Sequence, residues 1–67
     1  MENPSEIFVR RYALEVFGEQ ILTDQWLEVK VPALGNESPD TLLKSAVDEN
    51  LRRVLAVLVQ LDYGVAG

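Results

Sequence analysis

The sequence predicts an all-α fold, a compact bundle of about four short helices with the longest helix at the C-terminus. Two observations support this fold class. Apolar residues recur at spacings of three and four rather than two, and capping residues, proline or glycine mark where each such run starts or stops. With 67 residues the chain has room for one domain, which we place at residues 1–67.

The first helix is predicted to begin within residues 3–6, Asn-Pro-Ser-Glu. Asn3 offers a capping side chain, the proline suits the first helical position, and the acid lies near the positive helix end. The helix runs to about Phe17, since Gly18 favours the left-handed conformation that ends helices. The residues expected on its inward face are Val9, Ala13, Val16 and Phe17.

A second helix is expected over residues 19–28. Its start is favoured by Glu19, because an acid is stabilising near the positive N-terminal end of a helix. The helical period directs inward a set of large apolar residues, namely Ile21, Leu22, Trp26 and Leu27.

Residues 29–37 are predicted to form an ordered loop. Pro32 interrupts any helix, and the pair Gly35-Asn36 favours a turn with positive φ. Valines alternate around Lys30 as in a strand, but the run is too short and no partner strand is evident.

A short third helix is expected from residues 38–40, Ser-Pro-Asp, to about Lys44. Serine followed by proline repeats the combination of a cap and a first helical residue. Leu42 and Leu43 are then directed at the core.

The longest helix is predicted to open with residues 45–48, which resemble a capping box with aspartate in place of glutamate. It continues to Asp62 or Tyr63, where Gly64 is the natural stop. Its inward stripe holds Val47, Leu51, Val54, Leu55, Leu58 and Leu61 or Asp62. Val57 and Val59 extend the apolar surface beyond one stripe, so the helix needs cover on a second side. Either another subunit or partner supplies that cover, or the helix lies centrally in its own domain.

The chemistry of the side chains argues against an enzyme. The chain has no histidine and no cysteine, which removes catalytic triads, histidine zinc sites and thiol chemistry. Its four glycines lie far apart and form no phosphate-binding motif. We therefore expect no catalytic residue, no metal site and no cofactor.

The net charge and the hydropathy of the chain limit which partners and which cellular location are expected. The net charge of -5 repels a phosphate backbone, so direct nucleic-acid binding is not expected. The longest apolar run, residues 54–61, is too short to span a membrane, which takes about 20 residues. The N-terminus lacks the basic start and apolar run of a signal peptide, so a cytoplasmic location is expected.

Five short motifs occur in order along the chain. They are Trp26-Leu27, residues 32–35 (Pro-Ala-Leu-Gly), Ser38-Pro39 with Leu42-Leu43, Val54-Leu55, and residues 61–65 (Leu-Asp-Tyr-Gly-Val). In this order and spacing the chain resembles the C-terminal toxin-binding domain of Xre/MbcA/ParS-type antitoxins, over roughly residues 16–67. It departs from the usual antitoxin in lacking an N-terminal helix-turn-helix domain, which puts DNA-binding autoregulation in doubt.

The resemblance implies a protein partner, a RES-domain toxin that acts on NAD and is neutralised when the antitoxin covers its active-site entrance. By the same resemblance, Tyr63, Gly64 and Val65 match the tail placed near the toxin, and Ala66 and Gly67 follow that tail. A homodimer or hetero-oligomer is expected. The alternative is a structural module that forms a homodimer without binding a toxin.

Two further candidate partner contacts precede this tail on the last helix, Arg52 and Arg53. Either they pair with acids of the partner, or they belong to a solvated face helped by Asp48 or Glu49 at helical spacing.

Overall fold

The computed structural model describes residues 5–64 and shows four α-helices joined by short connections. In chain order the elements are α1 (Glu6–Phe17), α2 (Gln20–Glu28), the 3₁₀ turn η1 (Pro32–Leu34), α3 (Pro39–Lys44) and α4 (Asp48–Asp62). The predicted all-α bundle with its longest helix last is confirmed. No helix within residues 5–64 is long and apolar enough to cross a membrane.

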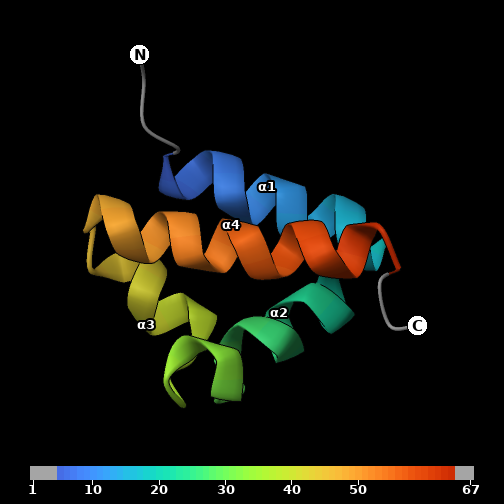
Figure 1. Ribbon diagram of the computed structural model, residues 1–67. Helices are drawn as coiled ribbons and strands as arrows, with labels where there is room; N and C mark the ends of the chain where they lie inside the picture. The colour runs from blue at the N-terminus through green and yellow to red at the C-terminus, as the bar shows by residue number, and fades with distance from the viewer. Residues whose placement is uncertain (1–4, 65–67) are drawn as a thin grey trace.

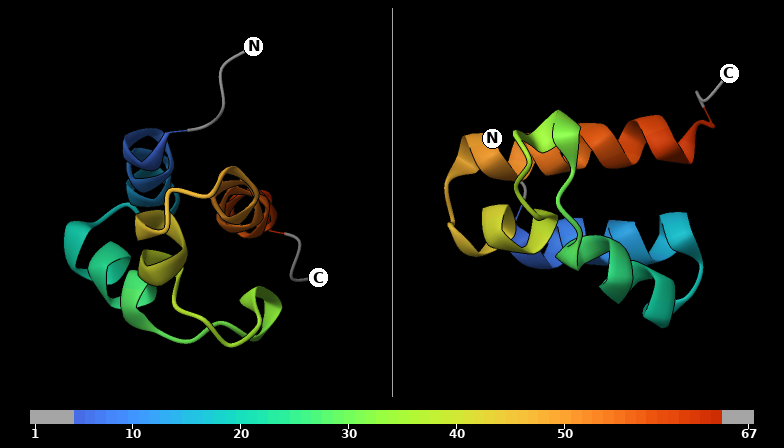
Figure 2. Two further views of the ribbon diagram at one scale, coloured as in Figure 1. Left: turned by 90° about the vertical axis from the view of Figure 1, so that its left-hand side faces the viewer. Right: turned by 90° about the horizontal axis from the view of Figure 1, so that it is seen from below.

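Helices α1 and α4 lie side by side and run in the same direction (Figure 1). Helix α4 also contacts α3 and η1, while α2 packs against α1 and α3. Figure 2 shows α4 along one edge of the bundle rather than at its centre. The core between the helices consists of Val9, Ala13, Leu27, Leu34, Leu42, Leu43, Leu51, Val54 and Leu58.

Helix α1 starts and stops on local hydrogen bonds. The cap is Ser5, not Asn3 as predicted, because the Ser5 hydroxyl oxygen accepts the Phe8 N–H at 3.0 Å. The predicted cap residues 3 and 4 lie outside the described residues. At the other end Gly18 has φ 76°, and its N–H donates to the Leu14 carbonyl at 2.7 Å, so the predicted stop is confirmed.

Helix α2 faces the core differently from the prediction. Ile21 and Leu22 are 65% and 46% exposed, so their predicted inward position is wrong. Thr23 and Leu27 are buried instead. This short helix buries only one narrow stripe, and Thr23 can occupy it because its hydroxyl donates to the Glu19 carbonyl at 2.7 Å.

Trp26 of α2 is half-buried and packs against a ring of α1. Its ring lies 5.3 Å from that of Phe17, at an interplanar angle of 41°. This tilted aromatic pair ties α2 to α1 beside the core.

The loop between α2 and α3 is closed by its own backbone. Val31 and Glu37 form an isolated antiparallel bridge, with the Val31 N–H donating to the Glu37 carbonyl at 3.1 Å. Gly35 and Asn36 have φ 71° and 63°, as the predicted turn requires. The loop thereby holds Leu34 in the core with only 1% of its surface exposed.

The junction between α3 and α4 departs from the predicted capping box. Ser38 caps α3 as expected, accepting the Thr41 N–H at 3.2 Å. Helix α4, however, begins at Asp48, and its cap residue Val47 offers no side-chain hydrogen bond. Ser45 is engaged at the end of α3, where its hydroxyl donates to the Leu42 carbonyl at 2.6 Å. The same hydroxyl accepts a hydrogen bond from Asn50 Nδ2 of α4 at 3.0 Å, so Ser45 links the two helices but is not the cap of α4.

The inward stripe of α4 is narrower than predicted. Leu51, Val54 and Leu58 are buried, but Val47 and Leu61 at the two ends are 50% and 47% exposed, which corrects their predicted core positions. The outward face of α4 is exposed, so the alternative of a central, enclosed helix is wrong.

Candidate partner-binding surface

The C-terminal end of α4 projects an aromatic side chain into solvent. Tyr63 follows the last helical residue and is 77% exposed. Its N–H still donates to the Val59 carbonyl at 3.1 Å, so the backbone under the ring is held by the helix. Gly64 then takes φ 62°, and its N–H donates to the Leu61 carbonyl at 3.1 Å. The chain therefore leaves α4 on a fixed turn with Tyr63 at its rim.

A hydrogen bond from α1 fixes the last turn of α4. The Tyr12 hydroxyl donates to Asp62 Oδ2 at 2.8 Å, across 50 positions of the sequence. The Tyr12 ring also stacks on Phe8, with centroids 6.5 Å apart and planes within 9°. Tyr12 thus lies beside the helix end that carries Tyr63, with Phe8 stacked on its ring.

This region has a negative electrostatic character. The hydrogen bond to Asp62 raises the pKa of Tyr12 to about 12, with desolvation and the nearby Tyr63 and Glu15 adding to the shift. The last turn of α4 contains no basic residue, and the negative end of the helix dipole lies there. Tyr12 therefore stays neutral at physiological pH and acts as a hydrogen-bond donor to the carboxylate.

The two predicted arginines lie on α4 but not at its C-terminal end. Arg52 Nε contacts Asp48 Oδ2 at 2.7 Å, which is the helical pairing expected for a solvated face. Arg53 is exposed. Its Nη2 atom lies close to Gly35 in the loop between α2 and α3, 3.7 Å from the point where a β-carbon would stand if Gly35 had a side chain. Tyr63 lies eleven positions after Arg52, a distance of roughly 16 Å along the helix axis.

Three predicted site residues, Val65, Ala66 and Gly67, lie outside the described residues. The structure thus presents Tyr63 and Gly64 together and leaves Arg52 and Arg53 about three turns away. Sequence reasoning missed Tyr12 at this surface. Its helical position next to the buried stripe of α1 was a usable signal, because such a residue reaches neighbouring helices.

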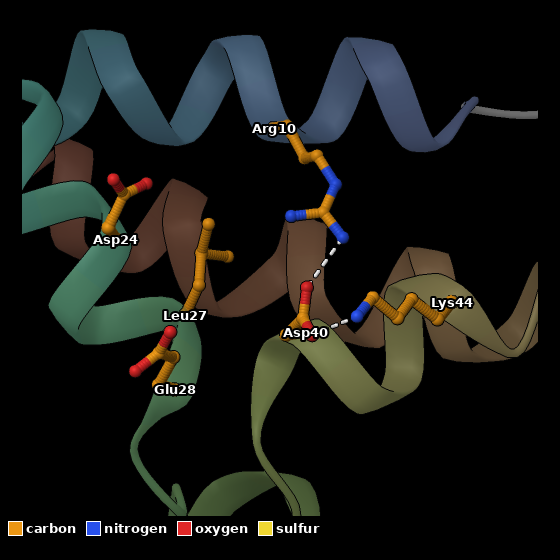
Figure 3. Close-up of a pocket in the computed structure, with 6 residues that line it drawn as sticks. All are labelled: Arg10, Asp24, Leu27, Glu28, Asp40 and Lys44. Carbon is orange, nitrogen blue, oxygen red and sulfur yellow. Dashed lines mark hydrogen bonds and ion pairs between the residues drawn. The ribbon is translucent and has the colours of Figure 1, made fainter.

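A second candidate site lies between α1, α2 and α3 (Figure 3). It is a cavity of about 260 Å³ lined by Arg10, Asp24, Leu27, Glu28, Asp40 and Lys44. Within residues 5–64 no group of three or more acids could hold a metal ion.

Both basic side chains of this cavity form ion pairs with Asp40. Arg10 Nη2 contacts Asp40 Oδ1 at 2.6 Å and its Nε contacts Glu6 Oε2 at 2.8 Å, while Lys44 Nζ lies 3.1 Å from Asp40 Oδ2. The hydrogen bond from Arg10 lowers the pKa of Asp40. Burial would lower the pKa of Arg10, but its bonds to both carboxylates outweigh this and raise it. We interpret this network as a tie between α1 and α3.

Residues 13–64, more than three quarters of the chain, match the family model described as the antitoxin Xre/MbcA/ParS C-terminal toxin-binding domain. The chain belongs to this family. No curated protein and no solved structure shows a significant match. The match confirms the resemblance drawn from the motifs, although it begins at residue 13 rather than 16 and ends at Gly64.

The family motifs of the Xre/MbcA/ParS domain fall on the elements that shape it. The Pro-Ala-Leu-Gly motif forms η1 and its cap, and the Ser-Pro motif starts α3. Tyr63 and Gly64 form the end of α4. Membership of a toxin-binding family supports an antitoxin role, with a toxin as partner.

Proposed function

We propose that this chain is an antitoxin module that neutralises a cognate RES-domain toxin by covering its active-site entrance with the C-terminal end of α4 and the following tail. It acts by binding and not by catalysis, and it acts in the cytoplasm. The observation that supports this most is the match to a toxin-binding family in a chain whose last helix ends in a 77% exposed tyrosine.

Electrostatics support the same arrangement. A toxin that consumes NAD must hold a pyrophosphate, so its entrance is expected to be positively charged. The chain carries a net charge of -5 and no basic residue in the last turn of α4. An acidic helix end with an exposed aromatic ring complements such an entrance, since complementary charge speeds association and a buried aromatic anchors it.

The test is inhibition of the RES-domain protein encoded beside the gene of this chain, measured as NAD consumption at increasing antitoxin concentration. The wild-type chain is expected to abolish NAD consumption. Tyr63→Ala is expected to weaken inhibition by about thirtyfold, which corresponds to about 2 kcal/mol for a central aromatic contact.

Ile21→Ala is the matched control, because Ile21 is 65% exposed on α2, a helix that the proposed contact does not use. It should inhibit like wild type. Failure of the wild-type chain to bind or inhibit the toxin would refute the proposed function. Equal inhibition by Tyr63→Ala and wild type would refute the role of the helix end.

A further inference from the structure

The last turn of α4 extends beyond the core of the domain. Leu58 is the last buried residue of the helix, and Leu61 is already 47% exposed. Backbone groups at a helix end lack partners within the helix, so terminal turns open more readily than central ones. Since Tyr63 directly follows this turn, an opening of the turn would also move its ring.

The residue that ends α4 weakens this turn. Asp62 is an acid at the negative end of the helix dipole, and the last turn contains no basic residue to balance it. Aspartate is also a poor helix former. Local forces alone therefore disfavour Asp62 at this position. Such a conflict between local preference and the folded structure is typical of a functional position.

A contact from α1 compensates for this weakness. The Tyr12 hydroxyl donates to Asp62 Oδ2 at 2.8 Å, and a hydrogen bond to an ionised acceptor is stronger than one between neutral groups. Within residues 5–64 it is the sole side-chain hydrogen bond or ion pair that reaches residues 59–64. The last turn of α4 is therefore held from a helix that lies 50 positions away in the sequence.

The donor of this hydrogen bond is itself held in place. Tyr12 lies in the middle of α1, next to the buried Ala13, and its ring packs against the core. The ring also stacks on Phe8, with planes within 9°. Tyr63 lies close enough to contribute to the raised pKa of Tyr12, so the contact forms near the ring at the helix end. A packed side chain of this kind places its hydroxyl at a fixed point, as a positioning role requires.

We propose that Tyr12 is a positioning residue for toxin binding, which holds Asp62 so that the last turn of α4 stays wound and Tyr63 keeps one orientation. This inference rests on the proposed function and adds a residue of α1 to it. Tyr12 lies one position before the segment that matches the toxin-binding family, so the match does not assign it this role. A helix end that is already ordered loses less conformational entropy on binding, which raises affinity without a new contact.

The first test is amide hydrogen exchange of the free chain, measured by NMR with no toxin present. Tyr12→Phe keeps the ring and removes only the hydroxyl. It is expected to speed exchange of the Tyr63 amide, which donates to Val59, by about fivefold, while the amides of Val54 and Leu58 exchange as in wild type. Unchanged exchange at Tyr63, or an equal increase throughout α4, would overturn the positioning role.

Asp62→Ala provides the background that shows whether the hydroxyl acts through this contact. Once the acceptor is gone, adding Tyr12→Phe is expected to leave exchange of the Tyr63 amide unchanged, because two residues that act through one bond are not additive. A fivefold increase in this background as well would show that the hydroxyl acts elsewhere, and it would overturn the proposal.

The second test is inhibition of the RES-domain protein encoded beside the gene of this chain. Tyr12→Phe is expected to weaken inhibition by about threefold, and to have no effect when Tyr63 is already alanine, because the bond acts through that ring. Equal losses in both backgrounds would contradict the positioning role. A wild-type chain that does not inhibit the toxin would refute the proposed function and this role together, whereas full inhibition by Tyr12→Phe would refute the positioning role alone.

Discussion

The two ends of α4 differ in how they are attached to the rest of the domain. At the N-terminal end Asn50 Nδ2 donates to the Ser45 hydroxyl at the end of α3 at 3.0 Å, and Leu51 is only 7% exposed. At the C-terminal end Leu61 is 47% and Tyr63 is 77% exposed, and Tyr12 reaches Asp62 through an exposed hydrogen bond. The first end is packed into the fold, and the second end exposes the side chains that we propose contact a partner.

Under the proposed function, one helix serves both packing and recognition, with a different part of its length for each. A 67-residue chain cannot spare an element for binding alone, because its core is already close to the minimum for a stable fold. The proposed binding side chains project from the end of a helix whose earlier turns contribute Leu51, Val54 and Leu58 to the core.

The same substitution at the two ends gives the largest expected contrast. Leu51→Ala is expected to lower the free energy of unfolding by about 3 kcal/mol, because it leaves a cavity in the core. Leu61→Ala should cost under about 1 kcal/mol, since roughly half of that side chain is already in water. Urea unfolding followed by circular dichroism measures both values. Equal losses of unfolding free energy in the two variants would contradict the different packing of the two ends of α4.

Removing the hydroxyl of Tyr12 is expected to have a smaller effect on stability. Tyr12→Phe keeps the ring on Phe8 but deletes the bond to Asp62, so its melting temperature should be slightly below that of wild type at neutral pH. The pKa of Tyr12 is raised in the folded state, to about 12. The stabilisation by its hydroxyl is therefore fully present below the unfolded pKa of about 10 and is lost as the pH rises towards 12.

Melting temperatures of wild type and Tyr12→Phe measured from neutral pH to pH 12 test this window. The difference in melting temperature between wild type and Tyr12→Phe should become smaller as Tyr12 loses its proton. A difference in melting temperature that stays constant from neutral pH to pH 12 would show that the hydroxyl does not stabilise the fold through its bond to Asp62.

The sequence predicted most of the fold because its signals are local. Gly18 and Ser38 were placed correctly, since a left-handed stop and a serine-proline start depend on neighbouring residues only. Two of the errors have different causes. Ile21 faces solvent because the packing of α2 against its neighbours selects the stripe with Thr23. Ser45 was misread because two local uses compete for its hydroxyl, and it donates to the Leu42 carbonyl three residues earlier instead of capping α4.

The candidate site could be predicted only in part. Resemblance led to Tyr63 and Gly64, and the structure gives these two residues an exposed, fixed turn. Tyr12 could not be assigned from sequence, because its bond to Asp62 spans 50 positions and depends on how α1 and α4 align. Long-range pairing of this kind leaves no periodic pattern along the chain.

The most direct measurement is amide chemical-shift mapping of the ¹⁵N-labelled chain as the unlabelled RES-domain protein is added. We expect the largest changes at residues 59–64, the end of α4 that carries Tyr63, and small changes in α3 and η1. Changes concentrated on α3 and η1, with the Tyr63 amide unaffected, would contradict the assignment of recognition to the C-terminal end of α4.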